Sequence, residues 1–275
     1  CPGRGAICNI APQTRDRRNG RIWNGPGSAV QRCTLHRVRG TSPCMFDLTP
    51  DDWTAVALSL RIAVVSTVVA LPFGIAIAYV LARKQFWGKT LVDAVVHQPL
   101  VLPPVVTGYL LLITFGRRAP VGSFLADTVG IVFSFRWTGA ALACGIMAFP
   151  LMVRAIRLSI EAVDRKLEEA GMTLGANRFW TFATITLPLT LPGIIAGMML
   201  AFARALGEFG ATITFVSNIP GETQTISAAI YTQTQVPGGD AAALHLVVVA
   251  IIISLAALVA SEWLARRAAI RLHGG

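Results

Sequence analysis

The feature that most constrains this chain is a series of five apolar runs, each about 20 residues long or longer. A helix of about 20 apolar residues spans the hydrocarbon core of a bilayer and satisfies its own backbone hydrogen bonds there. The sequence therefore predicts an all-α integral membrane protein with five transmembrane helices. We expect these helices at about residues 53–81, 91–115, 135–156, 192–215 and 242–264.

Four of the five runs contain proline, and in two of them its position predicts the shape or the start of the helix. The second run contains Pro99, Pro103 and Pro104, so its helix should be kinked or partly unwound, because proline removes backbone hydrogen bonds. Pro192 opens the fourth run and suits the first turn of a helix.

The net charge of +10 would fit a nucleic-acid-binding protein, but the charge is unevenly distributed. Residues 1–44 hold eight arginines and one acid, which leaves a net charge of only +3 for the rest of the chain. The whole chain is 54% hydrophobic and 14% charged, against about 25% charged for an ordinary soluble domain. We therefore expect membrane lipid, and no nucleic acid, among the partners of this protein.

Residues 1–44 also contain four of the five cysteines and no apolar run. They resemble neither a signal peptide, which needs an apolar segment, nor a zinc module, because no C-x2-4-C pair occurs. We expect them to be a non-native or disordered extension, with translation starting at Met45. The membrane domain would then cover 45–267, followed by a short cytoplasmic tail at 268–275.

Lys and Arg residues predict the orientation of the helices, because they concentrate in cytoplasmic loops. Residues 83–90, residues 154–187 and the C-terminus share one side, which holds eleven Lys and Arg. The opposite side holds three, Arg117, Arg118 and Arg136, when residues 1–44 are left out. We therefore expect the 158–187 loop and the C-terminus in the cytoplasm.

The polar segment 158–187 has the pattern of an amphipathic helix over 158–175. Its apolar residues recur at spacings of three and four: Ile160, Val163, Leu167, Ala170 and Leu174. Gly175 suits the position that ends this helix, and Asn177 can cap a second short turn. A helix lying on the membrane surface is one interpretation. Small residues on the helix and acids on its polar face favour contact with another protein.

The same segment resembles a family signature. Glu169-Ala170-Gly171, Gly175, Ile185 and Leu187-Pro188 are similar in type and spacing to E-A-A-x3-G-x9-I-x-L-P, found in the permeases of ABC importers. Gly171 departs from that signature, which has alanine there; restoring alanine should leave coupling intact or improve it. The resemblance covers about 45–267. It implies the type 1 permease fold, with a cytoplasmic coupling helix seated in a cleft of a separate ATPase subunit.

A second stretch narrows the resemblance. Residues 205–215 (ALGEFGATITF) and 217–225 (SNIPGETQT) resemble molybdate permeases most closely, and sulfate permeases are similar through Leu-Gly-Glu-Phe-Gly. Within it, Glu208 follows Arg204 by four residues inside the predicted fourth helix, so the two can meet on one helical face. Such a pair is either a structural ion pair or part of the oxyanion path. Thr107, Thr212 and Thr214 could add hydroxyls to that path, although threonine in a membrane helix usually bonds its own backbone.

The resemblance implies the permease subunit of an ATP-driven importer that carries molybdate across the bacterial inner membrane. A second permease copy, two ABC ATPase subunits and a periplasmic oxyanion-binding protein would be its partners. ATP and Mg would bind the ATPase, because Gly88-Lys89-Thr90 lacks the first glycine and the strand of a phosphate-binding loop. No metal-ligand spacing occurs either, so we expect no cofactor, metal or catalytic residue on this chain.

Two alternatives stay open from the sequence. One is a permease for sulfate, thiosulfate or tungstate. The other is an ion-gradient secondary transporter, whose midplane site would need more coupling carboxylates than Glu208 alone.

Overall fold

A computed structural model describes residues 49–130 and 132–273, and every regular element in them is a helix. The predicted all-α class is therefore confirmed for this part of the chain. The predictions for residues 1–44 and for a start at Met45 lie outside the described residues. The helices are α1 (Pro50–Arg83), α2 (Lys89–Val101), α3 (Pro104–Phe115), α4 (Pro120–Val129), α5 (Trp137–Ala162), α6 (Arg165–Thr173), α7 (Arg178–Thr181), the π-helical turn η1 (Phe182–Thr186), α8 (Leu187–Leu206), α9 (Gly210–Val216), α10 (Ile226–Thr234) and α11 (Asp240–His273).

Four helical segments are long and apolar enough to cross a membrane. They are α1, α5, the continuous stretch Arg178–Leu206 and the first part of α11, Asp240–Ala260. The bent pair α2–α3 makes a fifth if it is one span, as the five apolar runs predict.

The second predicted helix, 91–115, is two helices that meet at an angle of 114°. Leu102 is extended, as a residue before proline prefers, and the next helix begins at Pro104. Two adjacent prolines remove two successive backbone donors, so the chain turns sharply where a single proline would only kink the helix.

The fourth predicted helix, 192–215, has different limits at both ends. Pro192 does not open the helix but lies inside α8, which begins at Leu187 and continues η1. This π-helical turn precedes Pro188. Proline has no N–H to donate, and the wider hydrogen bonding of the π-helical turn accommodates the missing donor. At the other end α8 stops at Leu206, and a three-residue break separates it from α9.

The last helix is longer than predicted. It continues past residue 264 through the expected tail to His273. Residues 265–273 are mostly good helix formers without glycine or proline, so nothing in the sequence ends the helix before Gly274.

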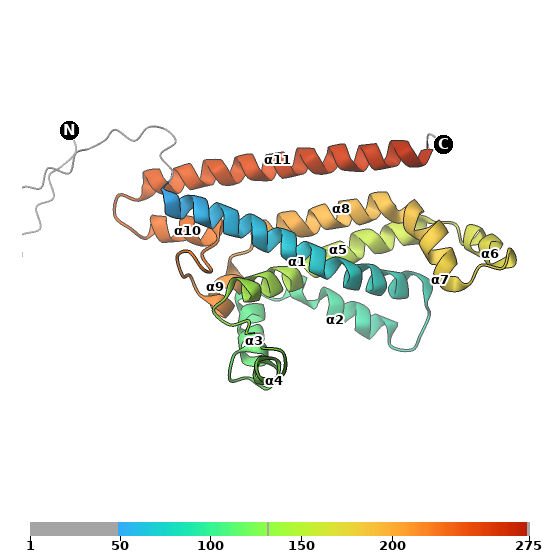
Figure 1. The fold of residues 1–275 in the computed structure, drawn as a ribbon, viewed down its shortest axis with the longest axis horizontal. Coiled ribbons are helices and arrows are strands. Elements are labelled where there is room, and N and C mark those ends of the chain that lie inside the picture. The colour runs from blue at the N-terminus through green and yellow to red at the C-terminus, as the bar shows by residue number, and fades with distance from the viewer. Residues whose placement is uncertain (1–48, 131, 274–275) are drawn as a thin grey trace, which may run out of the picture. The chain divides into compact units, whose positions relative to one another are not determined.

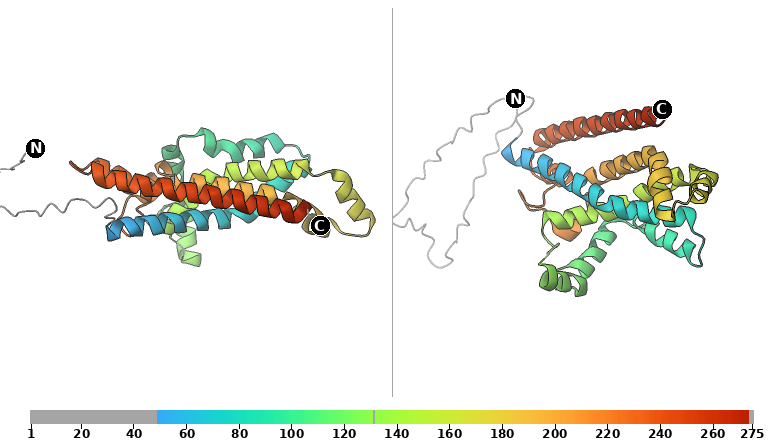
Figure 2. Two further views of the ribbon diagram at one scale, coloured as in Figure 1. Left: turned by 90° about the horizontal axis from the view of Figure 1, so that it is seen from above. Right: turned by 45° about the vertical axis from the view of Figure 1, so that its right-hand side comes forward.

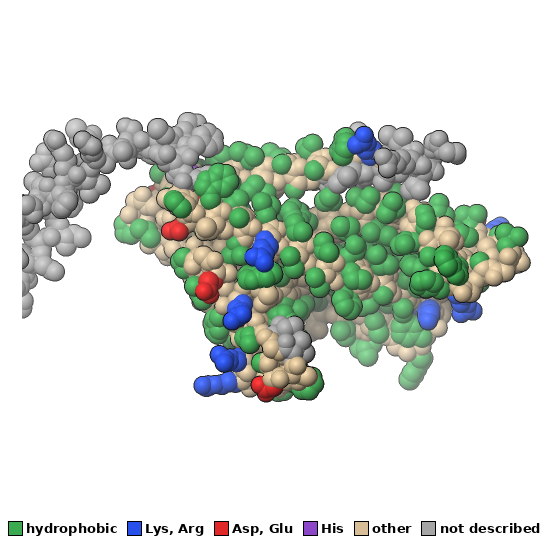
Figure 3. Space-filling view, in the orientation of Figure 1, with side chains coloured by type: hydrophobic (Ala, Val, Ile, Leu, Met, Phe, Trp, Pro, Cys, Tyr) green, Lys and Arg blue, Asp and Glu red, His purple; other side chains and the backbone are tan. Residues whose placement is uncertain are grey.

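The bundle is built around α1, α5 and α8, which run alongside one another, with α11 along α8 and α2 beside α5 (Figures 1 and 2). Small residues let these helices approach closely, as is usual between membrane helices. A methyl group on Gly74 of α1, for example, would lie 2.9 Å from Sδ of Met152 on α5. Hydrophobic side chains cover most of the middle of the molecule, as a lipid-facing surface requires (Figure 3). The short helices α6 and α7 project at one end of this bundle.

Candidate functional site

The predicted coupling helix is shorter than the sequence pattern indicated. A single helix over 158–175 is wrong, because α5 continues to Ala162 and Val163 is extended. Asp164 then caps α6 by accepting a hydrogen bond of 3.0 Å from the backbone N–H of Lys166. Ile160 and Val163 are therefore buried at the end of α5 and do not continue the apolar stripe of α6. The apolar residues of α5 and α6 recur at the same helical spacing, so the sequence reads as one helix. The N-cap at Asp164 marks where the second helix begins.

The end of α6 has the predicted form. Gly175 adopts φ +93°, a left-handed conformation that costs glycine little. Its N–H donates to the carbonyl of Met172, and the N–H of Ala176 donates to that of Gly171, which together form a Schellman motif. Asn177 caps the next turn, where its Oδ1 accepts from the N–H of Trp180 at 2.8 Å.

The signature residues lie on both sides of this turn. Gly171 packs against Ile185, so closely that a methyl group at position 171 would lie 2.6 Å from Cδ1 of Ile185. Leu187 and Pro188 are the first residues of α8, so they join the turn to a membrane helix. Glu169, Ala170 and Gly175 are exposed. The signature residues thus form two groups. Some pack α6 against the start of α8, and the others are exposed on the surface.

An ion pair that the sequence did not predict fastens this loop to α1. Nη2 of Arg83 lies 2.8 Å from Oε1 of Glu168 and also donates to the carbonyl of Val163 at 2.9 Å. The hydroxyl of Thr186 donates to the same Oε1 at 2.8 Å. Both charged side chains are largely buried, at 8% and 15% exposed. The network therefore joins the end of a membrane helix to α6 and to η1.

Bulky apolar side chains stand out from the same end of the molecule. Leu174 is 89% exposed, and Phe179 and Trp180 are also exposed. Because α6 and α7 project beyond the bundle, these side chains form an apolar surface next to polar residues. Such a surface is suited to contact with another protein.

Arg204 and Glu208 do meet, but not on one face of a continuous helix. Glu208 follows the end of α8, and its Oε2 lies 2.5 Å from Nη1 of Arg204. Its other oxygen, Oε1, accepts a hydrogen bond of 2.9 Å from the N–H of Ala211 in the first turn of α9. Glu208 is only 1% exposed, so its carboxylate joins two helices across the break. This arrangement is that of a structural ion pair with a helix-capping role.

Glycines allow α3 and α9 to approach each other closely beside this break. A methyl group on Gly210 would lie 2.8 Å from Cβ of Pro104, and one on Gly108 would lie 2.6 Å from the carbonyl oxygen of Ala211. The first turns of α3 and α9 are therefore in direct backbone contact. Only residues without a side chain allow this approach.

The threonines expected along the path are mostly bound to their own helix. Thr212 donates to the carbonyl of Phe209 and Thr214 to that of Gly210, both at 2.9 Å. Thr107 is different, because its hydroxyl is buried and has no partner among the described residues.

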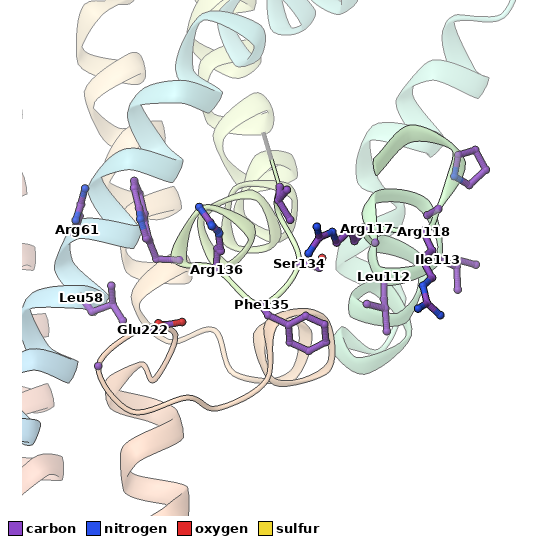
Figure 4. A pocket seen from close by; sticks show the side chains of 16 residues that line it. Leu58, Arg61, Leu112, Ile113, Arg117, Arg118, Ser134, Phe135, Arg136 and Glu222 are labelled. Carbon is purple, nitrogen blue, oxygen red and sulfur yellow. The ribbon is translucent and has the colours of Figure 1, made fainter. Parts of the chain in front are cut away.

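The three arginines counted on the outer side lie around one hollow of about 1170 Å³ (Figure 4). Arg117 and Arg118 follow α3, and Arg136 precedes α5. Arg61 of α1 joins them, with its guanidinium 4.0 Å from the centre of the Trp137 ring. None of these four arginines forms an ion pair within the described part of the chain. The hollow therefore has a strongly positive lining, in which Glu222 is the one acid.

Residues 70–270 match the family model described as "Binding-protein-dependent transport system inner membrane component". The chain belongs to this family.

Curated relatives of this transport-system component can be aligned with this chain over nearly their whole length. The "Molybdenum transport system permease protein ModB" of Escherichia coli (strain K12) is 59% identical over 219 residues, which are 80% of this chain and 96% of that protein. The protein of the same name from Haemophilus influenzae is 54% identical over 222 residues, or 81% and 97% of the two chains.

Among solved structures, a bacterial ABC transporter that imports the acidic polysaccharide alginate has the same fold, with a TM-score of 0.63. It is 18% identical and covers 80% of each chain, so it supports the arrangement of helices alone. The predicted fold of an ABC importer permease is confirmed. The chain is a membrane-spanning transport subunit with several apolar helices.

Proposed function

We propose that this permease carries molybdate inward across the inner membrane, driven by ATP hydrolysis on a separate ABC ATPase subunit. The carrying observation is the high identity to molybdenum transport permeases over nearly their full length. The identical residues extend through the membrane helices and are not confined to the signature. This extent of identity to molybdenum permeases favours molybdate over sulfate, thiosulfate or tungstate as the substrate.

The ATPase subunit binds the end of the molecule formed by α6 and α7. The exposed signature residues Glu169, Ala170 and Gly175 lie there, together with the projecting side chains of Leu174 and Phe179. The partner ATPase would supply ATP and Mg, and this chain supplies a surface that the ATPase moves.

Movement of α6 reaches the membrane helices through two connections. Arg83 and Glu168 join α6 to α1, while Ile185, Leu187 and Pro188 join it to α8. A displacement of the loop would therefore tilt α1 and α8 together, which is how access alternates between the two sides.

A second copy of this permease completes the path. The break at Gly207–Phe209, held by Arg204 and Glu208, directly follows the apolar stretch Arg178–Leu206 that is long enough to cross a membrane. Irregular backbone at membrane depth is tolerated where it is buried in protein or lines a cavity. We therefore place the gate at this break, beside Thr107 of the neighbouring helix α3, whose hydroxyl has no partner among the residues described.

The cytoplasmic side is the end that carries α6. In Figure 1, α11 ends at that same end of the bundle, which supports a cytoplasmic C-terminus in this proposal. The opposite end carries the hollow with the four arginines. An oxyanion-binding protein docks there from the periplasm, guided by positive charge.

The proposal is tested by complementation and co-purification. A strain without its own molybdate permease, given this chain with its neighbouring subunits, should recover molybdenum-dependent enzyme activity at low external molybdate. The tagged permease should also retain an ATPase subunit in mild detergent. Glu169→Ala should weaken that retention, and Glu222→Ala, an equally exposed acid at the other end, should not. Recovery that requires no ATPase subunit would contradict the proposal.

A further inference from the structure

A second charged cavity lies between α6, α7 and the end of α1, and it shares only Glu169 and Phe179 with the ATPase surface proposed above. It has a volume of about 880 Å³ and is lined by α1, α6, α7, η1 and the start of α8. Residues 165, 168, 169 and 172 of α6 line it, at helical spacings that place them on one face. The cavity therefore lies between this face of α6 and the membrane helix α1, beside the ion pair of Arg83 and Glu168 that joins them.

The cavity is apolar at one end and basic at the other. Pro72, Ile75 and Tyr79 of α1 line the apolar end together with Phe182, whose ring lies 4.8 Å from that of Tyr79. Lys84 follows α1 at the basic end. Along α1, Pro72 and Lys84 are about 18 Å apart at 1.5 Å per residue.

Three basic residues of this cavity have no counter-ion within the part of the chain that the structure describes. Lys84, Arg165 and Arg178 line it and form no ion pair among the described residues, whereas Arg83 is paired with Glu168. Glu169 lines the same cavity, so the four basic and two acidic residues leave a net charge of +2. An anion would balance this charge.

A buried hydroxyl gives an independent indication of a ligand. Thr181 lines the cavity and is only 3% exposed, yet its Oγ1 has no hydrogen-bond partner among the described residues. A buried hydroxyl without a partner costs about 1–3 kcal/mol, which a ligand oxygen accepting its hydrogen bond would recover.

We propose that this cavity binds one anionic phospholipid. The phosphate accepts hydrogen bonds from Lys84, Arg178 and the hydroxyl of Thr181, and an acyl chain lies along Ile75 and Tyr79. A soluble anion would use the basic end and leave the apolar end empty, whereas a phospholipid occupies both. Clusters of Lys and Arg at the cytoplasmic end of a membrane helix are suited to such headgroups. The bound lipid would contact α1, α6 and α7 together.

The test is lipid retention by the purified full-length permease, measured by native mass spectrometry with added phosphatidylglycerol or phosphatidylcholine. The wild type should retain one phosphatidylglycerol more than it retains phosphatidylcholine. Lys84→Gln combined with Arg178→Gln should reduce that retention about tenfold. Arg117→Gln combined with Arg118→Gln removes two exposed charges that form no ion pair among the described residues, and it should leave this lipid retention unchanged.

Thr181→Val supplies a second variant that keeps the shape of the side chain. It should weaken retention of phosphatidylglycerol several-fold without lowering the melting temperature, because the hydroxyl bonds to none of the described residues. Equal retention of the two lipids, or an equal loss in the Arg117 and Arg118 control, would overturn the proposal. Displacement of the lipid by millimolar inorganic phosphate alone would overturn it too, by assigning the cavity to a free anion. These readouts need no transport, so they stand apart from the test of molybdate import.

Discussion

Glu208 is a buried carboxylate whose stability depends on its two partners, Arg204 and the N–H of Ala211. Its carboxylate is almost fully buried, pairs with Arg204 and caps α9 through the N–H of Ala211. We expect Arg204→Ala to destabilise the permease by about 3 kcal/mol and to abolish uptake, because the charge stays buried without a partner. Adding Glu208→Gln should restore most of the stability, since its amide oxygen still accepts from Ala211. Thermal unfolding in detergent measures the stability of both variants. If Arg204→Ala alone were as stable as the wild type, this account would be contradicted.

Gly171 gives a second prediction at this scale. Alanine at position 171 would meet Cδ1 of Ile185 at 2.6 Å, the far end of a side chain that can rotate. We expect Gly171→Ala to cost about 1 kcal/mol of stability while coupling stays intact. In the double variant with Ile185→Val, which removes the contacting methyl group, that cost should disappear. Unfolding temperature and ATP-dependent uptake are the readouts; lost uptake in a fully stable variant would mean that Gly171 itself touches the ATPase.

Single residues were predictable from the sequence where their role is local. The helix end at Gly175 and the cap at Asn177 depend on residues a few positions away, and both are confirmed. The pair of Arg83 and Glu168 joins residues 85 positions apart, and nothing in the sequence pattern links them. Sequence reasoning counted Arg83 only as a marker of orientation.

At the scale of elements, the link between α6 and α1 makes coupling depend on Arg83. We expect Arg83→Ala to leave the rate of ATP hydrolysis by the bound ATPase unchanged and to reduce uptake about tenfold or more. Without the ion pair, α6 would move without moving α1. Arg154→Ala is the matched control, because Arg154 is an exposed arginine of α5 that forms no ion pair with any described residue. The ratio of molybdate transported to ATP hydrolysed measures the effect, and an unchanged ratio would exclude this role.

The positions of helices were predictable, but several of their ends were not. Apolar runs mark where a helix can lie in lipid, yet they do not show that Leu102-Pro103-Pro104 turns the chain by 114°. They also do not show that α8 reaches back through a π-helical turn or stops before Glu208. These ends depend on contacts between helices, such as that of Gly210 with Pro104, which apolar periodicity does not encode.

At the scale of the whole molecule, one end of the bundle carries the exposed apolar residues of α6 and α7, and another part carries four arginines that form no ion pair with a described residue. We expect Arg117→Glu combined with Arg118→Glu to weaken binding of the loaded oxyanion-binding protein about tenfold or more, mainly by slowing association. The effect should shrink at high salt, where exposed charges are screened. Binding of the partner to permease in nanodiscs measures this, with Lys84→Glu and Arg178→Glu as the opposite-end control; a loss independent of salt would contradict it.

The central claim is ATP-driven import of molybdate, and uptake into proteoliposomes tests it most directly. The permease would be reconstituted with its ATPase, its binding protein and labelled molybdate. We expect uptake that requires ATP and the binding protein together and that excess sulfate does not suppress. Uptake driven by an ion gradient without ATP, or ATP-driven uptake of sulfate but not of molybdate, would contradict the account.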